Sequence, residues 1–164
     1  MTIDPAIYRE ILTNFPSGVA IVTAHDARGT NYGLTVSAFC AVSLEPPLVL
    51  VCIDKGSSTL PAMRDAGGFT VNLLASDAEE LALRFATKSD DKFAGVAWAE
   101  PSVPEGGPIL TEDTVGFAVC TNHSEFEAGD HWIFVGSVRA GAVDPNQSPL
   151  VYGRRQFAAW DDVG

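Results

Sequence analysis

Hydroxyl-bearing residues gather in two short stretches of the sequence. In the first, residues 33–39, Thr35 and Ser37 lie two positions apart, so on a strand they face the same side. With the small neighbours Gly33 and Ala38 they form a flat polar shelf, suited to hydrogen bonds with the edge of a planar heterocycle. The plainer interpretation is a solvated barrel face, because threonine is common in strands.

The second stretch, residues 52–59, ends a predicted strand and opens a predicted helix. Lys55 stands just before three hydroxyl residues, Ser57, Ser58 and Thr59. A helix start offers free backbone N–H groups and the positive end of the helix dipole, and hydroxyls and an ammonium group add donors. This pattern suits a phosphate, and it equally fits a plain helix cap beside an exposed lysine.

The histidines carry a weaker signal. His131 follows Gly129 and Asp130 at the start of a predicted strand, where neighbouring side chains point to opposite faces, so Asp130 and His131 are expected to be poor partners. A lone strand histidine is more often structural than functional. His25, beside a predicted turn, and His123, in a predicted loop, receive no role.

Charged residues in two later segments have two interpretations. The run at residues 89–95 has the charges of a solvated turn. Arg154 and Arg155 are either surface charges or contacts for a cofactor phosphate.

Composition narrows the function classes. The 164 residues favour one domain spanning 1–164, and a net charge of −11 disfavours nucleic acid and anionic membranes as partners. The chain has no apolar run near the ~20 residues that span a bilayer and no signal-peptide pattern, which predicts a cytoplasmic protein. Cys40, Cys52 and Cys120 are expected to be buried, reduced thiols.

Several common motifs are missing from the sequence. It contains no G-x-G-x-x-G after the first strand, no P-loop, no H-E-x-x-H and no G-x-S-x-G. The cysteines form no C-x-x-C pair, so no metal site is expected. No motif in the sequence therefore indicates a Rossmann dehydrogenase, a kinase, a metalloprotease or a nucleophile-elbow hydrolase.

The elements that must position these residues follow from the periodicity. Residues 4–15 read as a helix capped by Asp4 with Pro5 at its first position. A capping box at residues 76–79 predicts a second long helix with Ala82 and Phe85 facing the core, and residues 101–108 read as a surface loop. Strands are predicted at 19–24 (buried on both faces), 31–43, 48–53, 69–74, 114–122, 131–141, 150–152 and 156–160.

Many short strands with two or three helices favour a mostly β fold, an antiparallel barrel with flanking helices. A doubly wound α/β sheet is the weaker alternative, because too few residues join the second and third strands for a parallel crossover.

Taken together, the sequence resembles the flavin reductase family, the small partners of two-component monooxygenases. The resemblance runs from about Phe15 to Tyr152. Seven stretches in the same order carry it: residues 15–19, 33–39, 42–50, 69–74, 91–95, 129–131 and 149–152. The chain departs from the family pattern at Trp132, which is bulkier than the small polar residue expected there.

The resemblance implies an FMN-binding split barrel that forms a homodimer, with the flavin near the subunit interface. Thr35, Ser37 and Ala38 would contact the isoalloxazine or ribityl chain, and Lys55, Ser57 and Thr59 would hold the phosphate. His131 would contact the nicotinamide or its phosphate as the residue acting in catalysis. Cys52, Ile53 and Asp54 would lie beneath the ring, and Phe85 and Lys92 would close the pocket. The other residues expected at the cofactor are Gly33, Leu34, Val36, Ser58, Tyr152 and Arg154.

The implied reaction is hydride transfer from the nicotinamide C4 of NADH or NADPH to N5 of FMN or FAD. Reduced flavin would then pass to a separate monooxygenase. The sequence leaves open FMN against FAD, NADH against NADPH, and the final acceptor. It also leaves three alternatives: a flavin-holding electron carrier, a ferric reductase acting through reduced flavin, and a non-catalytic split-barrel module.

Overall fold

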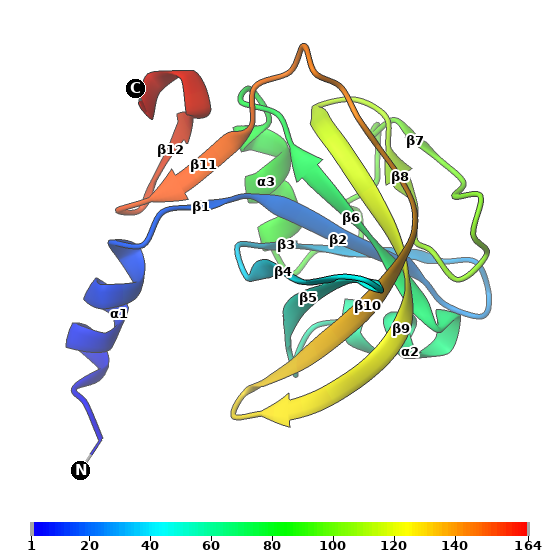
Figure 1. Ribbon diagram of the computed structural model, residues 1–164, viewed down its shortest axis with the longest axis horizontal. Helices are drawn as coiled ribbons and strands as arrows, with labels where there is room; N and C mark the ends of the chain where they lie inside the picture. The colour runs from blue at the N-terminus through cyan, green and yellow to red at the C-terminus, as the bar shows by residue number, and fades with distance from the viewer. Residues whose placement is uncertain (1, 164) are drawn as a thin grey trace.

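A seven-stranded antiparallel sheet forms the centre of the computed structural model, which describes residues 2–163. Its strands lie in the order β3-β2-β6-β9-β10-β5-β4 and curl into a barrel (Figure 1). The expected antiparallel, mostly β architecture is thereby confirmed. The bounds are β2 Ala20–His25, β3 Asn31–Val36, β4 Phe39–Leu44, β5 Pro47–Asp54, β6 Gly68–Leu74, β9 Thr114–Ala128 and β10 His131–Val143.

The two edge strands of this sheet, β3 and β4, are consecutive in the sequence. The prediction of one strand over residues 31–43 is therefore wrong, because its two halves pair with different partners. Thr35 lies opposite Ile21 on β2, whereas Phe39 lies opposite Val51 on β5. Ser37 and Ala38 make the step between the two edges.

Strand β2 is buried on both faces, as its unbroken apolar sequence predicts. Val22 belongs to a cluster with Val51, Phe69 and Phe134. Its neighbour Ile21 belongs to a second cluster, which includes residues of helix α3 (Glu79–Ala86). One strand thus joins the two apolar cores.

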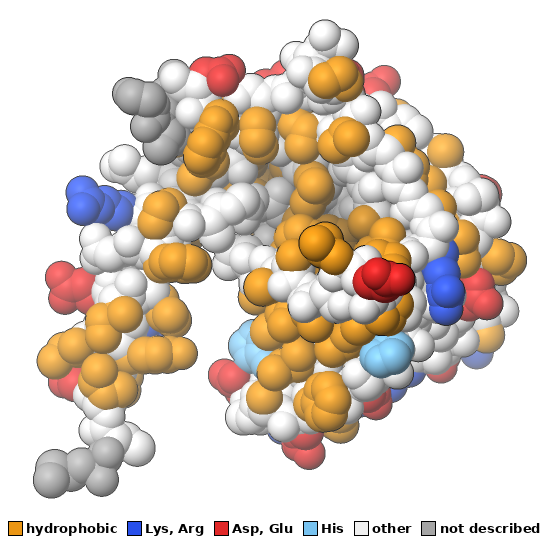
Figure 2. All heavy atoms as spheres, in the orientation of Figure 1, with side chains coloured by type: hydrophobic (Ala, Val, Ile, Leu, Met, Phe, Trp, Pro, Cys, Tyr) orange, Lys and Arg blue, Asp and Glu red, His pale blue; other side chains and the backbone are white. Residues whose placement is uncertain are grey.

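Helix α1 (Pro5–Thr13) begins as predicted, with the Asp4 carboxylate accepting a hydrogen bond from the N–H of Ala6. None of its residues is buried, and it projects away from the barrel (Figure 1). Figure 2 shows its hydrophobic side chains beside open space. The helix therefore leaves an apolar surface uncovered in the single chain.

Helix α3 keeps its predicted buried residues, Ala82 and Phe85, but lacks the predicted capping box. Its N-cap is Ala78, which makes no side-chain hydrogen bond. The N–H of Ser76 instead donates to the carbonyl of Ser148, which ties this segment to another part of the chain. The other helix near the sheet, α2 (Thr59–Ala66), and a short 3-10 turn, η1 (Trp160–Val163), complete the helices of the described residues.

The loop predicted to lie on the surface at residues 101–108 is partly wrong. Its last three residues are buried against the sheet. The hydroxyls of Thr23 and Thr70 donate to the carbonyls of Pro108 and Gly107 at 2.6 and 2.7 Å. Asn72 accepts from the N–H of Leu110 at 2.9 Å, so buried polar side chains of the strands hold this loop. Short strands β7 (Trp98–Ala99) and β8 (Ile109–Leu110) flank it.

The β9–β10 hairpin is longer than predicted. His123, expected in a loop, lies within β9, because pairing with β10 continues to Ala128 at the hairpin tip. At this tip His131 lies opposite both Ala128 and Asp54 of β5.

The cysteines are not uniformly buried, contrary to expectation. Cys40 is exposed on the edge strand β4, and Cys52 is half-buried. Burial raises the pKa of the Cys52 thiol and raises that of Cys120 to about 12. All three are free thiols.

A small three-stranded sheet stands beside the barrel. It consists of β1 (Ser17–Gly18), which the sequence did not predict, followed in space by β11 (Leu150–Gly153) and β12 (Gln156–Ala159). This sheet links the end of α1 to the C-terminal hairpin. No helix within residues 2–163 combines the length and apolar character needed to cross a bilayer.

Candidate functional site

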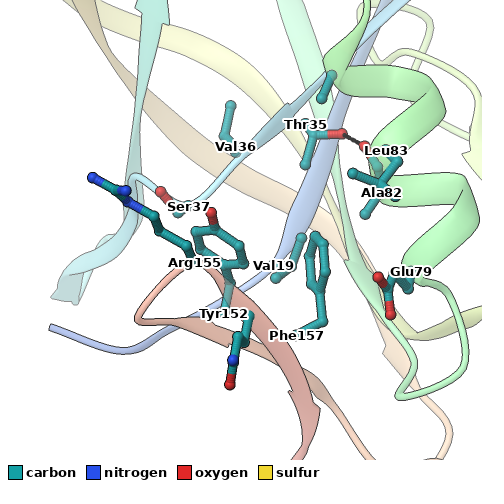
Figure 3. A pocket seen from close by; sticks show the side chains of 12 residues that line it. Val19, Thr35, Val36, Ser37, Glu79, Ala82, Leu83, Tyr152, Arg155 and Phe157 are labelled. Atoms are coloured by element: carbon teal, nitrogen blue, oxygen red, sulfur yellow. Dashed lines mark hydrogen bonds between the residues drawn. The ribbon is translucent and has the colours of Figure 1, made fainter. Parts of the chain in front are cut away.

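A cavity of about 680 Å³ lies between β3, α3 and the β11–β12 hairpin, and is called here the hairpin pocket (Figure 3). Its wall is largely apolar, with aromatic rings from the hairpin facing the strand and the helix. Pockets of this size and character hold small organic ligands. The lining residues are Val19, Thr35, Val36, Ser37, Glu79, Ala82, Leu83, Ala86, Tyr152, Arg155, Gln156 and Phe157.

The predicted hydroxyl shelf forms one side of this pocket. Thr35 and Ser37 both line it, as expected, although Ser37 follows the end of β3 and Val36 between them lines the cavity too. The hydroxyl of Thr35 donates a 2.6 Å hydrogen bond to the carbonyl of Ala82, drawn in Figure 3. This hydrogen bond holds α3 against β3 and uses the hydroxyl proton. Thr35 can therefore only accept a hydrogen bond from a ligand.

The turn of the C-terminal hairpin has an unusual backbone. Arg154 and Arg155 have φ values of 50° and 62°, between the paired residues Gly153 and Gln156. Positive φ at both central positions is the type I′ geometry, which Asn-Gly adopts without the strain that arginine incurs. Such strain tends to persist where function maintains it.

The two arginines of this turn have separate contacts. Arg155 lines the hairpin pocket. Arg154, which the sequence assigned to the cofactor, lies outside it and donates through Nε to Asn14 at 3.1 Å. Its backbone N–H also donates to Thr13, so Arg154 anchors the end of α1.

A second cavity, of about 350 Å³, opens at the start of α2 and is called the helix-start pocket. Ser58 is the helix N-cap and makes no side-chain capping bond, while Ser57 Oγ accepts from the N–H of Thr59 at 3.2 Å. Free hydroxyls at a helix start suit an anion. The pocket is lined by Leu34, Thr35, Asp54, Gly56, Ser57, Ser58, Phe85, Ala86, Thr87, Lys88, Ser89, Asp90 and Lys92.

Lys92 joins the loop after α3 to strand β3. Its Nζ donates to the carbonyls of Gly33 at 2.9 Å and Phe85 at 3.0 Å, and burial lowers the pKa of the ammonium. Gly33 permits this close packing, because a Cβ there would meet the Phe85 ring at 2.7 Å. The lysine brings positive charge to the helix-start pocket with two of its three N–H bonds already committed.

The two cavities adjoin each other, because Thr35 and Ala86 line both. The polar shelf and the helix start, far apart in sequence, thus lie beside one another in space, and the two cavities together are called the groove. An apolar chamber at one end and hydroxyls with two lysines at the other match a ring with a phosphate tail.

Some residues expected at the cofactor lie outside both cavities. Lys55 forms an ion pair with Glu127 at 2.5 Å and so faces the β9–β10 hairpin; this pairing lowers the pKa of Glu127. Ile53 and Thr59 are fully buried, the latter with an Oγ1 that has no hydrogen-bond partner within residues 2–163. Ala38 and Cys52 also line neither cavity, and Gly33 reaches the groove only beyond the helix-start pocket. Direct cofactor contacts for these residues remain predictions.

His131 also lies outside both cavities, at the tip of the β9–β10 hairpin. Its Nδ1 lies 2.7 Å from the Asp130 carboxylate, so the expectation that the two are poor partners is wrong. Asp130 belongs to the turn before the strand, where side-chain alternation does not apply. The hydrogen bond from His131 lowers the pKa of Asp130, which keeps that carboxylate ionised. The bulky Trp132 ring lies under the guanidinium of Arg64 at 4.3 Å and lines neither cavity.

The sequence analysis missed residues from three segments of the groove. The exposed face of α3 contributes Glu79, Leu83 and Ala86, whereas only its buried face produced a periodic signal. Asp90 lies in the charged stretch 89–95, which was interpreted as a solvated turn, and Lys88 lies just before that stretch. Phe157 of β12 had no sequence signal beyond its strand.

Comparisons with known proteins show the family of the chain. The family described as flavin reductase like domain matches residues 12–161. The chain is 42% identical over 96% of its length to a flavin reductase (NADH) of Kitasatospora aureofaciens, covering 83% of that protein. It is 39% identical over 94% of its length to the flavin-dependent monooxygenase reductase subunit HsaB of Rhodococcus jostii, covering 77% of it.

A solved structure has a similar fold. The NADH:FAD oxidoreductase SgcE6 of Streptomyces globisporus, in complex with NAD and FAD fragments, superimposes with a TM-score of 0.86. The two are 31% identical, and the match covers 96% of this chain and 94% of the other.

Proposed function

Because this chain belongs to the flavin reductase like domain family, we propose that it reduces FMN or FAD with NADH or NADPH and passes the reduced flavin to a separate monooxygenase. The relatives named as flavin reductases and as a reductase subunit of a flavin-dependent monooxygenase support this assignment. Within the chain, the observation that carries it is that the hairpin and helix-start pockets adjoin at Thr35, which lines both.

The residues present fit a flavin by their chemistry. The hairpin pocket supplies apolar and aromatic walls from Val36, Tyr152 and Phe157 for a planar ring. The helix-start pocket supplies hydroxyl and ammonium donors from Ser57, Ser58, Lys88 and Lys92 for a phosphate. Flavin, when bound, supplies the centre that accepts a hydride from the nicotinamide.

The protein itself contributes binding, orientation and charge. The Thr35–Ala82 hydrogen bond fixes the spacing of β3 and α3, which sets the width of the hairpin pocket. Arg155 brings a positive group to this pocket, where it favours electron-rich, negatively charged ligands. No proton donor is needed for hydride transfer, so rigid alignment is the main requirement on these side chains.

His131 is proposed to position the nicotinamide substrate. Asp130 accepts a hydrogen bond from its Nδ1, which fixes the ring and leaves Nε2 available. His131 lies opposite Asp54, and Asp54 lines the helix-start pocket, so the hairpin tip borders the groove.

The functional unit is proposed to be a homodimer built from one domain per chain, residues 1–164. Strand β2 contributes to both apolar clusters, which supports a single domain. The single chain exposes Ile7 and Ile11 on α1 by 53% and 57%, and Leu44 on the edge strand β4 by 94%. Apolar side chains exposed in such number favour a protein partner, and a second copy is the partner proposed.

One anaerobic experiment tests the function. The purified protein is mixed with FMN or FAD and with NADH or NADPH, and the flavin absorbance is followed. Bleaching faster than in protein-free controls is expected. Tight flavin binding without bleaching would instead indicate an electron carrier, and absence of flavin fluorescence quenching would indicate a non-catalytic module.

A further inference from the structure

The β11–β12 hairpin connects the hairpin pocket to helix α1. On one side of the hairpin, Tyr152, Arg155 and Phe157 line the pocket opposite β3 and α3 (Figure 3). On its other side, pairing of Tyr152 with Ser17 joins β11 to β1, the strand that follows α1. One hairpin therefore touches both the proposed flavin site and the segment that carries the helix.

Arg154, in the turn of this hairpin, holds the end of α1. Its backbone N–H donates to the carbonyl of Thr13 at 2.6 Å, and its Nε donates to Asn14 Oδ1 at 3.1 Å. Gly153 packs so closely on Pro16 that a Cβ on the glycine would lie 3.0 Å from the proline Cβ. Because no residue of α1 is buried, these contacts at its C-terminal end set the direction in which the helix projects.

The barrel also has an uncovered apolar surface, on the outer side of β5 and β10. Phe134 points into the core and is fully buried, so its neighbours Ile133 and Val135 point outward. Cys52 and Leu50 of β5 lie opposite these two, and all four side chains are half-buried. These four residues are called the outer sheet face. Figure 2 shows hydrophobic side chains in this region of the barrel, across open space from α1.

A second copy of the chain can cover both apolar surfaces at once. The small sheet holds α1 away from its own barrel, so the helix does not cover the outer sheet face of its own chain (Figure 1). In a two-fold dimer each α1 can lie on the outer sheet face of the other chain. The exposed Ile7 and Ile11 of α1 and the outer sheet face carry no charge, so their contact avoids the repulsion between two chains of net charge −11.

We infer that flavin binding and dimer formation are coupled through the β11–β12 hairpin. Flavin in the hairpin pocket contacts the hairpin on one side and β3 with α3 on the other, and thus fixes the hairpin relative to the barrel. The hairpin in turn orders α1 through Arg154, so that α1 is oriented for docking before the second copy arrives. Each event then favours the other by the same factor. This inference rests on the proposed function and on the homodimer proposed with it.

The test compares the dimer dissociation constant of the complete chain with and without saturating flavin, FMN or FAD, whichever binds more tightly. Analytical ultracentrifugation measures it, and flavin is expected to lower it about tenfold. Reciprocally, the flavin dissociation constant measured by fluorescence quenching should be about tenfold lower well above the dimer constant than well below it.

Arg154→Asn removes the side-chain bond to Asn14, and asparagine tolerates the positive φ of this position. The variant should reduce the coupling to less than about threefold, while its flavin affinity in dilute, monomeric protein stays that of the wild type. Arg28→Ala is the matched control for the lost charge, because Arg28 is exposed in the turn between β2 and β3 and lines neither cavity of the groove.

Hydrogen exchange separates the hairpin from any direct contact between flavin and the second chain. In an Ile7→Glu/Ile11→Glu monomer, flavin should slow amide exchange in residues 13–19 as well as in residues 150–157. Slowing confined to 150–157, a dimer constant that flavin leaves unchanged, or full coupling in Arg154→Asn would each overturn the inference. Those results leave flavin reduction standing, whereas absence of nicotinamide-dependent bleaching refutes that function without touching the coupling.

Discussion

Lys92 and Gly33 are joined by a 2.9 Å hydrogen bond from the lysine Nζ to the glycine carbonyl. The bond lies at the wall of the helix-start pocket, and it fastens the loop after α3 to the edge strand β3. One side chain therefore both shapes the groove and supplies it with positive charge.

Replacing Lys92 by methionine removes the charge and keeps most of the aliphatic length. The dissociation constant for flavin is expected to rise about tenfold to a hundredfold, the range for a lost charged hydrogen bond. Fluorescence quenching measures it. Lys88→Met is the comparison within the same pocket, and an unchanged affinity in Lys92→Met would contradict the assigned role.

The lowered pKa of Lys92 gives a pH dependence with a defined sign. Flavin affinity is expected to fall as pH rises through this lowered pKa, at a pH below the ordinary value of 10.5. Between the two values the unfolded chain holds more protons than the folded chain, so the contribution of Lys92 to the free energy of unfolding rises with pH. Affinity titrations and urea denaturation from pH 7 to 11 should show these opposite trends, and Lys92→Met should lose both.

The strained turn of the C-terminal hairpin offers a change that separates stability from binding. Arg154→Asn/Arg155→Gly places the preferred type I′ residues at the two positive φ angles. The free energy of unfolding is expected to rise by about 1 kcal/mol, while flavin affinity falls because Arg155 no longer lines the hairpin pocket. Arg154→Asn alone keeps Arg155 and should keep affinity; a double variant that binds flavin normally would show that Arg155 has no binding role.

The proposed positioning role of His131 predicts a kinetic split. His131→Ala should raise the KM for NADH or NADPH more than it lowers kcat, because hydride transfer needs no proton from the ring. Steady-state kinetics at saturating flavin measure both constants. His123→Ala, an exposed histidine on β9, is the control. A hundredfold loss of kcat at unchanged KM would contradict this role.

The uncovered surface of α1 predicts the behaviour of the chain in solution. The wild-type protein is expected to elute as a dimer in size-exclusion chromatography with light scattering. Ile7→Glu/Ile11→Glu places charges in the exposed apolar face and should yield a monomer. Arg9→Ser on the same helix should stay dimeric, and a wild-type monomer at tens of micromolar would refute the dimer.

Asn72 holds the buried loop before β9 to the sheet. Asn72→Ala leaves the N–H of Leu110 without its acceptor, and the free energy of unfolding is expected to fall by about 2 kcal/mol. Urea denaturation measures the change. Asn146→Ala, in an exposed turn, should stay within about 0.5 kcal/mol of wild type.

Local signals in the sequence were enough for most elements. Apolar runs located β2, β5 and β6, and Asp4 with Pro5 located the start of α1. The break at Ser37 could not be read from the sequence, because nothing local reveals that β3 and β4 pair at opposite edges of one sheet. Partner choice is a long-range property, whereas propensity is a local one.

The same distinction separates the parts of the site. Thr35 and Ser37 do line one cavity, but the spacing argument assumed one strand, and Ser37 lies beyond the end of β3. Lys55 was expected to hold the phosphate because it precedes the start of a helix. Its ammonium instead pairs with Glu127, 72 positions later in the chain. Arg155 reaches the pocket through a backbone conformation that arginine rarely adopts, and no pattern of residue types predicts it.

Only Ser37 and Ala38 connect β3 to β4, although the two strands form opposite edges of the sheet. Formation of the flavin groove therefore depends on strands from late in the sequence. β3 becomes an edge of the barrel by pairing with β2, but β4 depends on β5, and β5 in turn pairs with β10 near the end of the sequence. The hairpin that closes the first cavity comes later still. The walls of the flavin groove are therefore complete only once almost all of the chain has emerged from the ribosome, and we expect incomplete chains not to bind flavin.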